Sequence, residues 1–188
     1  MLINNDTILK DNDPFIRQKS EEVPLPLNKE DETLLREMLQ YVKDSTNEEK
    51  AEAMNLRPAV GISAIQVGVP KRMTAVVLDE YDKDGNPVHF EFMLVNPKIV
   101  SSSVQKAYLD AGEGCLSVVT EHPGHVLRSA RIKVRGYDLC TDQYIEIRAR
   151  GYLAIVLQHE LDHFEGILFY DHIDKNNPFA VEENAIAI

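Results

Sequence analysis

Two histidines four residues apart, His159 and His163, lie in the stretch QHELDH, and Glu160 directly follows the first. Residues four apart share one face of a helix, so both imidazoles can bind one metal ion while the glutamate lies beside it as a base. The preceding residues, YLAIVL, are apolar and predict a buried helix. The alternative is a pair of core histidines satisfied by hydrogen bonds, but the motif favours a metal site.

A catalytic metal usually has three protein ligands and one open position, so a third ligand is needed. The candidates are Cys115, in EGCLS, and a downstream carboxylate from Glu182 or Glu183. The second option needs another helix, yet DKNNPFAVEENAIAI contains a proline and two asparagines where that helix would form. Cys115 is therefore favoured. The other cysteine, Cys140, lies in the turn-like DLCTDQ and is predicted to be a structural thiol.

The stretch AVGISAIQVG carries Gly61 and Gly68 on either side of small and apolar residues. It lacks the lysine and hydroxyl of a phosphate-binding loop and the spacing of a dinucleotide site, so nucleotide binding is excluded. Its one side-chain amide, Gln66, is a neutral donor suited to an oxygen that becomes negative during acyl transfer. A tight loop followed by a strand is the simpler alternative.

These residues need a scaffold, which the hydrophobic pattern predicts. Asp13 and Pro14 begin a short helix that is predicted to run into Lys19, and Asn28 caps a longer one with apolar residues at helical spacing. The polar segment 43–58 is predicted to be a surface excursion without chemistry. Alternating or apolar runs predict strands, and DKDGNP predicts a hairpin turn. The predicted strands are MTAVVLDEY, HFEFMLVNP, RIKVRGYD, QYIEIRARG and a short ILFY. A helix from Tyr152 to Phe164, ended by Gly166, completes the pattern.

The order of elements predicts an α+β fold with antiparallel sheets around a central buried helix that binds metal. The length of 188 residues suits one domain spanning 1–188. A net charge of -11 disfavours direct DNA binding and attachment to an anionic membrane, although a local basic patch is compatible with it. The polar N-terminal residues do not form a signal peptide, so a cytoplasmic protein is expected.

Three motifs in this order, AVGISAIQ, EGCLS and QHELDH, resemble those of peptide deformylase, and the resemblance covers nearly the whole chain. The first departs from the family pattern Gly-x-Gly-x-Ala-Ala-x-Gln at Ala59 and Ser63, which bears on fine substrate positioning. The polar excursion before LRPAVG, and an end without a long helix, are similar to the deformylases of Gram-positive bacteria.

The resemblance implies one divalent metal held by Cys115, His159 and His163, with water in the fourth position. Fe²⁺ is expected, and Zn²⁺, Ni²⁺ or Co²⁺ also suit these ligands. Glu160 is implied as the base that takes the water proton. The side-chain amide of Gln66 and the backbone N–H of Leu116 are implied to stabilise the negative charge on the formyl oxygen.

The implied substrate is the N-formylmethionine end of a nascent peptide, which releases formate. Its backbone is expected to pair with the chain at Val60, Gly61 and Gly114. The methionine pocket would be lined from the metal-binding helix, by Tyr152 and Ile155. Arg128 matches an arginine near the substrate entrance, where it would pair with Glu113 or contact the peptide. The ribosome near its exit tunnel is an expected transient partner.

Two other functions remain open from the sequence. One is a metallopeptidase that uses Glu182 or Glu183 in place of Cys115. The other is a binding protein of the same fold with a structural metal, inactive through changes such as Ala59 and Ser63. None of the remaining histidines, which lie in polar or turn-like contexts, is expected to bind the metal directly: His89, His122, His125 and His172.

Overall fold

The structure is a computed structural model that describes residues 2–188. Its larger sheet is antiparallel, with the order β1-β2-β3-β6-β7. Its strands are β1 (Gly61–Ser63), β2 (Met73–Tyr81), β3 (Pro87–Ser102), β6 (Arg131–Asp138) and β7 (Gln143–Arg150). A smaller sheet has the order β5-β4-β8, with β4 (Lys106–Tyr108), β5 (Arg128–Ser129) and β8 (Ile186–Ala187). The α-helices are α1 (Lys29–Ser45), α2 (Glu48–Met54) and α3 (Gly151–His163), and short 3-10 turns are η1 (Pro14–Arg17), η2 (Ala64–Val67) and η3 (Phe169–His172).

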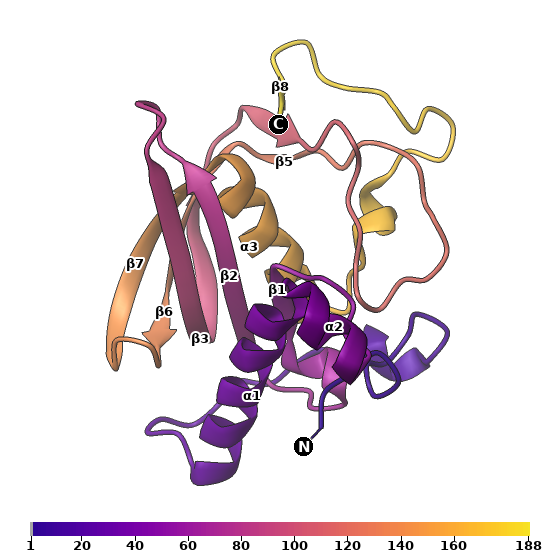
Figure 1. Ribbon diagram of the computed structural model, residues 1–188. Helices are drawn as coiled ribbons and strands as arrows, with labels where there is room; N and C mark the ends of the chain where they lie inside the picture. The colour runs from indigo at the N-terminus through magenta and orange to yellow at the C-terminus, as the bar shows by residue number, and fades with distance from the viewer. Residues whose placement is uncertain (1) are drawn as a thin grey trace.

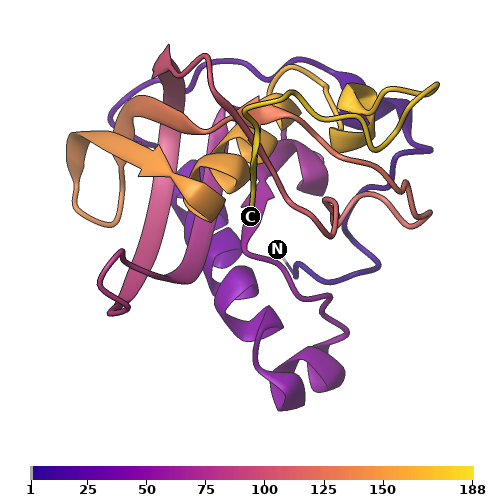
Figure 2. The ribbon, with the colours of Figure 1, turned by 90° about the horizontal axis from the view of Figure 1, so that it is seen from above.

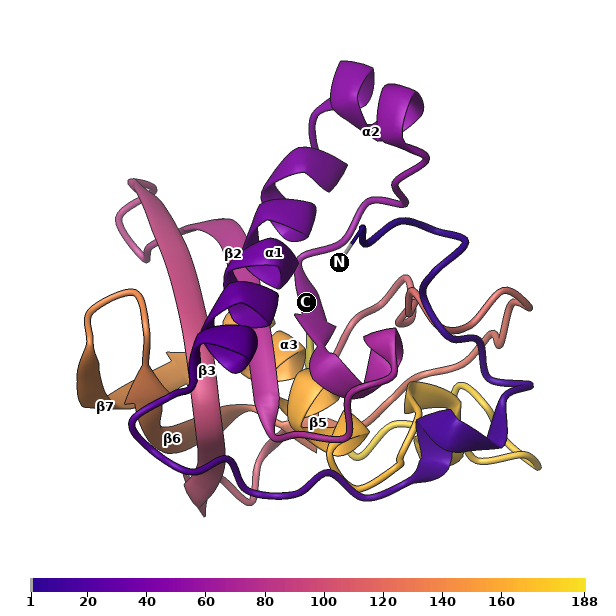
Figure 3. The same ribbon diagram turned by 90° about the horizontal axis from the view of Figure 1, so that it is seen from below.

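The two longer helices cover opposite faces of the larger sheet (Figures 1 and 3). Successive residues of a strand point to opposite faces, so Ala75 belongs to the core under α1 while its neighbour Val76 belongs to the core under α3. The helix α1 contributes Leu35 and Met38, which are fully buried, from its apolar stripe. The sheet therefore has a hydrophobic core on each side.

Helix α3 lies between the two sheets. Ala154 and Leu157 pack on the larger sheet, whereas Ile155 packs with Ala107 and Ala130 on the side of the smaller one. A helix buried on several faces must be apolar nearly all round, which explains why its sequence has little amphipathic character. This arrangement confirms the predicted α+β fold with a central buried helix.

The local signals at the element ends are also confirmed. The side chain of Asn28 accepts a hydrogen bond from Asp31 N at 2.8 Å and so caps α1. Asp13 caps the turn at Pro14 in the same way. Gly85, with φ +81°, forms the hairpin turn between β2 and β3, where a side chain would be strained.

Two local predictions are wrong. The stretch ILFY is not a strand, because Leu168 N bonds to Asp171 Oδ2 at 2.9 Å and the chain turns into η3. The helix that begins at Pro14 is one 3-10 turn and ends at Arg17, before Lys19. Within the polar segment 43–58, α2 is capped by Asn47 and has no buried residue, so it is a surface helix. No helix among residues 2–188 is long and apolar enough to cross a membrane.

Candidate active site

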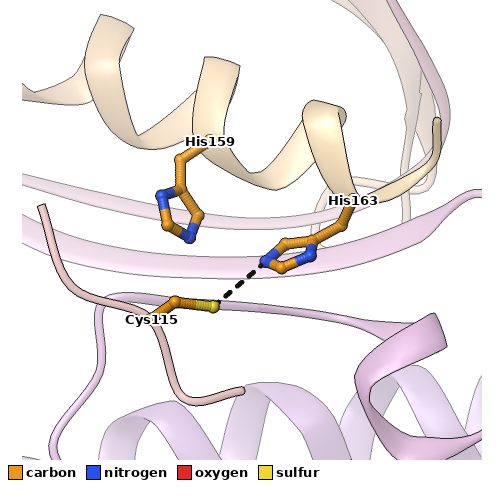
Figure 4. A group of neighbouring side chains, drawn as sticks. All are labelled: Cys115, His159 and His163. Carbon is orange, nitrogen blue, oxygen red and sulfur yellow. Dashed lines mark hydrogen bonds between the residues drawn. The ribbon is translucent and has the colours of Figure 1, made fainter. Parts of the chain in front are cut away.

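Helix α3 presents His159 and His163 on one face, toward the loop between β4 and β5 that carries Cys115 (Figure 4). The sulfur of Cys115 lies 3.5 Å from Nε2 of His163. One donor atom from each of the three residues lies within 4.8 Å of the others. The i, i+4 spacing places the two rings, and only the fold brings in a cysteine from 48 residues earlier in the chain.

The spacing of these donors fits a metal ion. Metal–sulfur and metal–nitrogen bonds of about 2.3 and 2.0–2.1 Å at a tetrahedral angle separate the two donors by roughly 3.6 Å. The observed separation of 3.5 Å between Cys115 and His163 agrees with that value. A thiolate with two imidazoles suits zinc, iron, nickel or cobalt, and not magnesium or calcium, which prefer oxygen ligands.

The electrostatics of the cluster favour the thiolate that metal binding needs. Burial disfavours the charged sulfur, but His163 and His159 outweigh it and lower the pKa of Cys115 to about 6. Burial likewise opposes the charged form of His159, yet hydrogen bonds to Cys115 and Glu113 raise its pKa. The thiol is therefore ionised near neutral pH, which makes it a ready ligand.

A chain of buried charges holds His159 in place from behind. Nδ1 of His159 bonds to Glu113 Oε1 at 2.9 Å, so its Nε2 faces the cluster. Glu113 receives two hydrogen bonds from Arg128, at 2.7 and 3.0 Å, and Arg128 also donates to Asp162 at 2.9 Å. His172 contacts Asp162 at 2.8 Å. Such partners fix the orientation and tautomer of a ligand histidine.

Of the two roles predicted for Arg128, the structure shows the pairing with Glu113. The arginine is only 4% exposed and lines a different hollow from the one beside the metal cluster. Its guanidinium contacts two carboxylates, Glu113 and Asp162, and it does not line the cavity beside the metal cluster.

Glu160 is buried beside the cluster, and β1 fixes its carboxylate. Its Oε2 accepts a hydrogen bond from the hydroxyl of Ser63 at 2.7 Å, and Thr74 Oγ1 lies 3.5 Å from the same oxygen. Gly61 packs against it so closely that an added Cβ would lie 2.6 Å from Oε1. Two residues of the first motif, Gly61 and Ser63, thus position the predicted base. Ser63, one of the two departures from the family pattern, has a direct contact with Glu160.

Gln66 directs its amide nitrogen toward the cluster. Its Oε1 accepts a hydrogen bond from Ser63 N at 2.8 Å, so the NH₂ group must point the other way. That nitrogen donates to Ser117 Oγ at 3.1 Å and lies 3.6 Å from the sulfur of Cys115. The carbonyl of Leu116 accepts from Lys10 at 3.1 Å, and among residues 2–188 its N–H has no acceptor. Two neutral donors therefore lie next to the cluster.

These groups line one cavity of about 330 Å³. It contains all the predicted catalytic and substrate residues except Arg128, namely Val60, Gly61, Gln66, Gly114, Leu116, Tyr152, Ile155 and Glu160, together with Cys115 and His159. Sequence reasoning missed Thr46 and Arg57, which come from the segment assigned no chemistry. The sequence held no signal for them, because Thr46 is placed at the pocket by the packing of the end of α1, and Arg57 by the return of the chain after α2.

The other metal-site hypotheses do not fit the geometry. The cluster found among residues 2–188 contains Cys115 and neither Glu182 nor Glu183, both of which are exposed near the C-terminus. The metallopeptidase arrangement is therefore wrong. Cys140 is a free, exposed thiol in the turn between β6 and β7. None of the four unassigned histidines belongs to the cluster described among residues 2–188: His89, His122, His125 and His172.

Comparison with known proteins decides the family. The polypeptide deformylase family matches residues 5–179 of the chain. The chain belongs to this family. Peptide deformylase 2 of Bacillus subtilis (strain 168) is 48% identical over 187 residues, which cover 100% of this chain and 99% of that protein. The peptide deformylase of Ligilactobacillus salivarius (strain UCC118) is 46% identical over 100% of both chains.

Solved structures that resemble this chain are also peptide deformylases. The peptide deformylase of Ehrlichia chaffeensis has a TM-score of 0.69 and 30% identity, over 90% of this chain and 88% of that one. The Acinetobacter baumannii enzyme, solved with Met-Ala-Ser bound, has a TM-score of 0.69 and 27% identity, over 92% and 100% of the two chains. The chain is therefore a deformylase of the Gram-positive type, a hydrolase that removes the formyl group from N-terminal formylmethionine. The hypothesis of an inactive binding protein is not supported.

Proposed function

We propose that Cys115, His159 and His163 hold one divalent ion, Fe²⁺ in the cell, and that Glu160 is the catalytic base for deformylation. The observation that carries this proposal is that the three donor atoms lie within 4.8 Å of one another, and that Cys115, His159 and Glu160 line the same cavity. Zn²⁺, Ni²⁺ and Co²⁺ suit the same donors. The bound ion would supply Lewis acidity to the formyl carbonyl and lower the pKa of the attacking water.

Glu160 would take a proton from that water and return it to the amine that leaves. The water oxygen adds to the formyl carbon, the C–N bond breaks, and the products are formate and a peptide with a free amino group. Ser63 holds Oε2 of the glutamate at 2.7 Å, which leaves Oε1 as the oxygen that handles the proton. A positioned base of this kind contributes about 10²–10⁴-fold to the rate.

Gln66 and Leu116 would stabilise the formyl oxygen as it gains negative charge. Both donors are neutral and buried, at 1% and 5% exposure, so the surroundings do not screen them. The hydrogen bond from Ser63 N fixes the amide in advance, which avoids reorganisation during the reaction.

The peptide would bind as an added strand along β1, which is the terminal strand of its sheet and, among residues 2–188, pairs only with β2. Val60 and Gly61 would bond its backbone on one side and Gly114 on the other. Tyr152 and Ile155, which line the same cavity, would contact the methionine side chain. The Met-Ala-Ser bound to the A. baumannii relative supports peptide binding in this fold.

We further propose that residues 1–188 act as one catalytic domain in the cytoplasm, on nascent chains at the ribosome. Family membership supports this setting, since formylmethionine occurs at the start of newly made proteins.

The test is formate release from formyl-Met-Ala-Ser by anaerobically purified, iron-loaded protein. Acetyl-Met-Ala-Ser should be a poor substrate, because its extra methyl group must fit where the formyl group has only hydrogen. Glu160→Gln, which keeps the shape of the side chain, should retain the ion and lose at least about 10²-fold in kcat. Retained turnover in this variant would remove Glu160 from the role of base.

A further inference from the structure

The outward faces of β6 and β7 carry two adjacent rows of cations. The strand register places Arg131 opposite Arg150, and Lys133 opposite Arg148. On the next strand, Lys98 lies opposite Arg135 of β6. We name these six side chains the basic ladder: Lys98, Arg131, Lys133, Arg135, Arg148 and Arg150.

The basic ladder lies away from the active-site cavity. The alternate residues of the same strands, such as Val134 and Ala149, are buried in the core under α3, so the ladder points to the other face of the sheet. Helix α1 packs on that face over β2 and β3, and the hairpin of β6 and β7 extends beyond it, opposite the long loops (Figures 1 and 2). A partner on the ladder would leave the cavity open.

Few carboxylates offset these cations. Glu146 contacts Arg135 at 2.9 Å and Arg148 at 3.4 Å, and Glu22 pairs with Lys98. Among residues 2–188, the other three cations of the ladder have no carboxylate within 4.0 Å. Six cations minus two carboxylates leave a local charge of +4, in a chain whose net charge is -11.

Protection of a sheet edge does not explain this pattern. β7 is a terminal strand, and charged side chains on such strands discourage aggregation. Charges of either sign would serve, and opposite charges across the strands would also stabilise the hairpin. One charged pair across the hairpin, Arg135 with Glu146, has opposite signs, but the chain sets Arg131 against Arg150 and Lys133 against Arg148, and these like charges repel each other. Two like-charge pairs, kept at a cost to stability in an acidic protein, indicate an anionic partner.

We propose that the basic ladder docks on the phosphate backbone of double-helical RNA. Four of its six members are arginines, whose planar fork binds phosphate oxygens in pairs. The side chains of Arg135 and Arg148 are 67% and 76% exposed, which suits an extended backbone rather than an enclosed small anion. The right-handed twist of the strands at this end of the sheet follows a curved duplex better than a flat bilayer.

The test measures binding of the full-length protein to a fluorescent RNA duplex of about 20 base pairs, by anisotropy, between 50 and 200 mM KCl. Four phosphate contacts predict a slope of log K against log salt of about -2.8 to -3.6, so this fourfold rise in salt should weaken binding roughly 50- to 150-fold. The ladder variant is Arg131→Gln, Lys133→Gln and Arg148→Gln combined. Its matched control changes three exposed lysines elsewhere in the same way: Lys29→Gln, Lys83→Gln and Lys175→Gln.

The ladder variant should bind RNA at least about tenfold more weakly at 50 mM KCl, and its slope of log K against log salt should be less negative by roughly 2–3. The control variant should match the unaltered protein. Absence of RNA binding at 50 mM KCl, or equal losses in both variants, would overturn the proposal. So would ladder-dependent binding to vesicles of 30% phosphatidylserine in phosphatidylcholine without binding to RNA. Formate release from a short formyl peptide should be the same in all three proteins, so the outcome is independent of the proposed catalytic mechanism.

Discussion

The close approach of β1 to the catalytic base gives a sharp test of the site. An added Cβ at Gly61 would lie 2.6 Å from Oε1 of Glu160 and 2.8 Å from its Cδ. Ordinary contacts of this type begin at 3.4 Å, so Gly61→Ala must displace the carboxylate by about 0.8 Å. Glu160 is a flexible side chain, so we expect it to move while the backbone stays in place. The hydrogen bond of 2.7 Å from Ser63 would stretch or break.

A displacement of this size has a large effect on rate. Misplacing a reacting group by about 1 Å costs on the order of 10²-fold, which corresponds to ~2.7 kcal/mol of transition-state stabilisation. Stability should change little, because the alanine lowers the entropy of the unfolded chain by ~0.4–1 kcal/mol and so offsets part of the local strain. We therefore expect Gly61→Ala to lose about 100-fold in kcat/KM with a nearly unchanged unfolding temperature.

The assay is formate release from formyl-Met-Ala-Ser, with metal content and thermal unfolding measured on the same preparations. Gly85→Ala is the matched control, because Gly85 has φ +81° in the turn between β2 and β3 and lies outside the cavity. That variant should lose roughly 1 kcal/mol of stability through backbone strain and keep its activity. Activity of Gly61→Ala within about threefold of that of the unaltered protein, or loss of its metal, would contradict a displaced carboxylate.

Three further outcomes follow from the site. Cys115→Ser should abolish stoichiometric metal binding by elemental analysis, whereas Glu182→Gln should keep it; metal retained without the cysteine would contradict the ligand assignment. Gln66→Leu should lower kcat by about 10²–10³-fold with the metal still bound, and an unchanged kcat would exclude the amide as a charge-stabilising donor. Burial opposes the charge on Glu113, but its hydrogen-bond partners outweigh burial and hold its pKa below the ordinary range. Glu113 therefore stabilises the fold fully above pH ~4.3, and this stabilisation is lost as the pH falls through the lower pKa of the folded state. In Glu113→Gln, the free energy of unfolding, measured with urea, should fall less steeply as the pH is lowered through this range. An equally steep fall in the variant and the unaltered protein would contradict this.

The sequence predicted best those elements whose pattern repeats over many residues. The alternation in β6 and the apolar run of α3 predicted these elements correctly, because every residue of a long pattern indicates the same element. The stretch ILFY failed because it is short and apolar in a way that suits a strand. Its turn depends on Asp171, and Arg17 from the distant η1 contacts both Gly166 O and Asp171.

In the active site too, local spacing could be read from the sequence, whereas contacts between distant residues could not. The spacing of His159 and His163 determined by itself that two imidazoles and a neighbouring carboxylate share one region, because helical geometry depends only on residues a turn apart. The motifs also identified Cys115 and Gln66 by type and context. Only the tertiary structure decided that Arg128 supports His159 through Glu113 rather than lining the cavity.

Tertiary packing likewise decides that Arg57 lines the cavity and that the cations of the basic ladder lie on one surface. Arg57 reaches the cavity because α2 turns the chain back toward β1. The cations of β6 and β7 become one surface only when Arg131 pairs with Arg150 across the hairpin. Residue types and local spacing determine which chemistry the chain can perform. Contacts between residues far apart in sequence decide where that chemistry is assembled, because they depend on the burial of whole faces rather than on any local pattern.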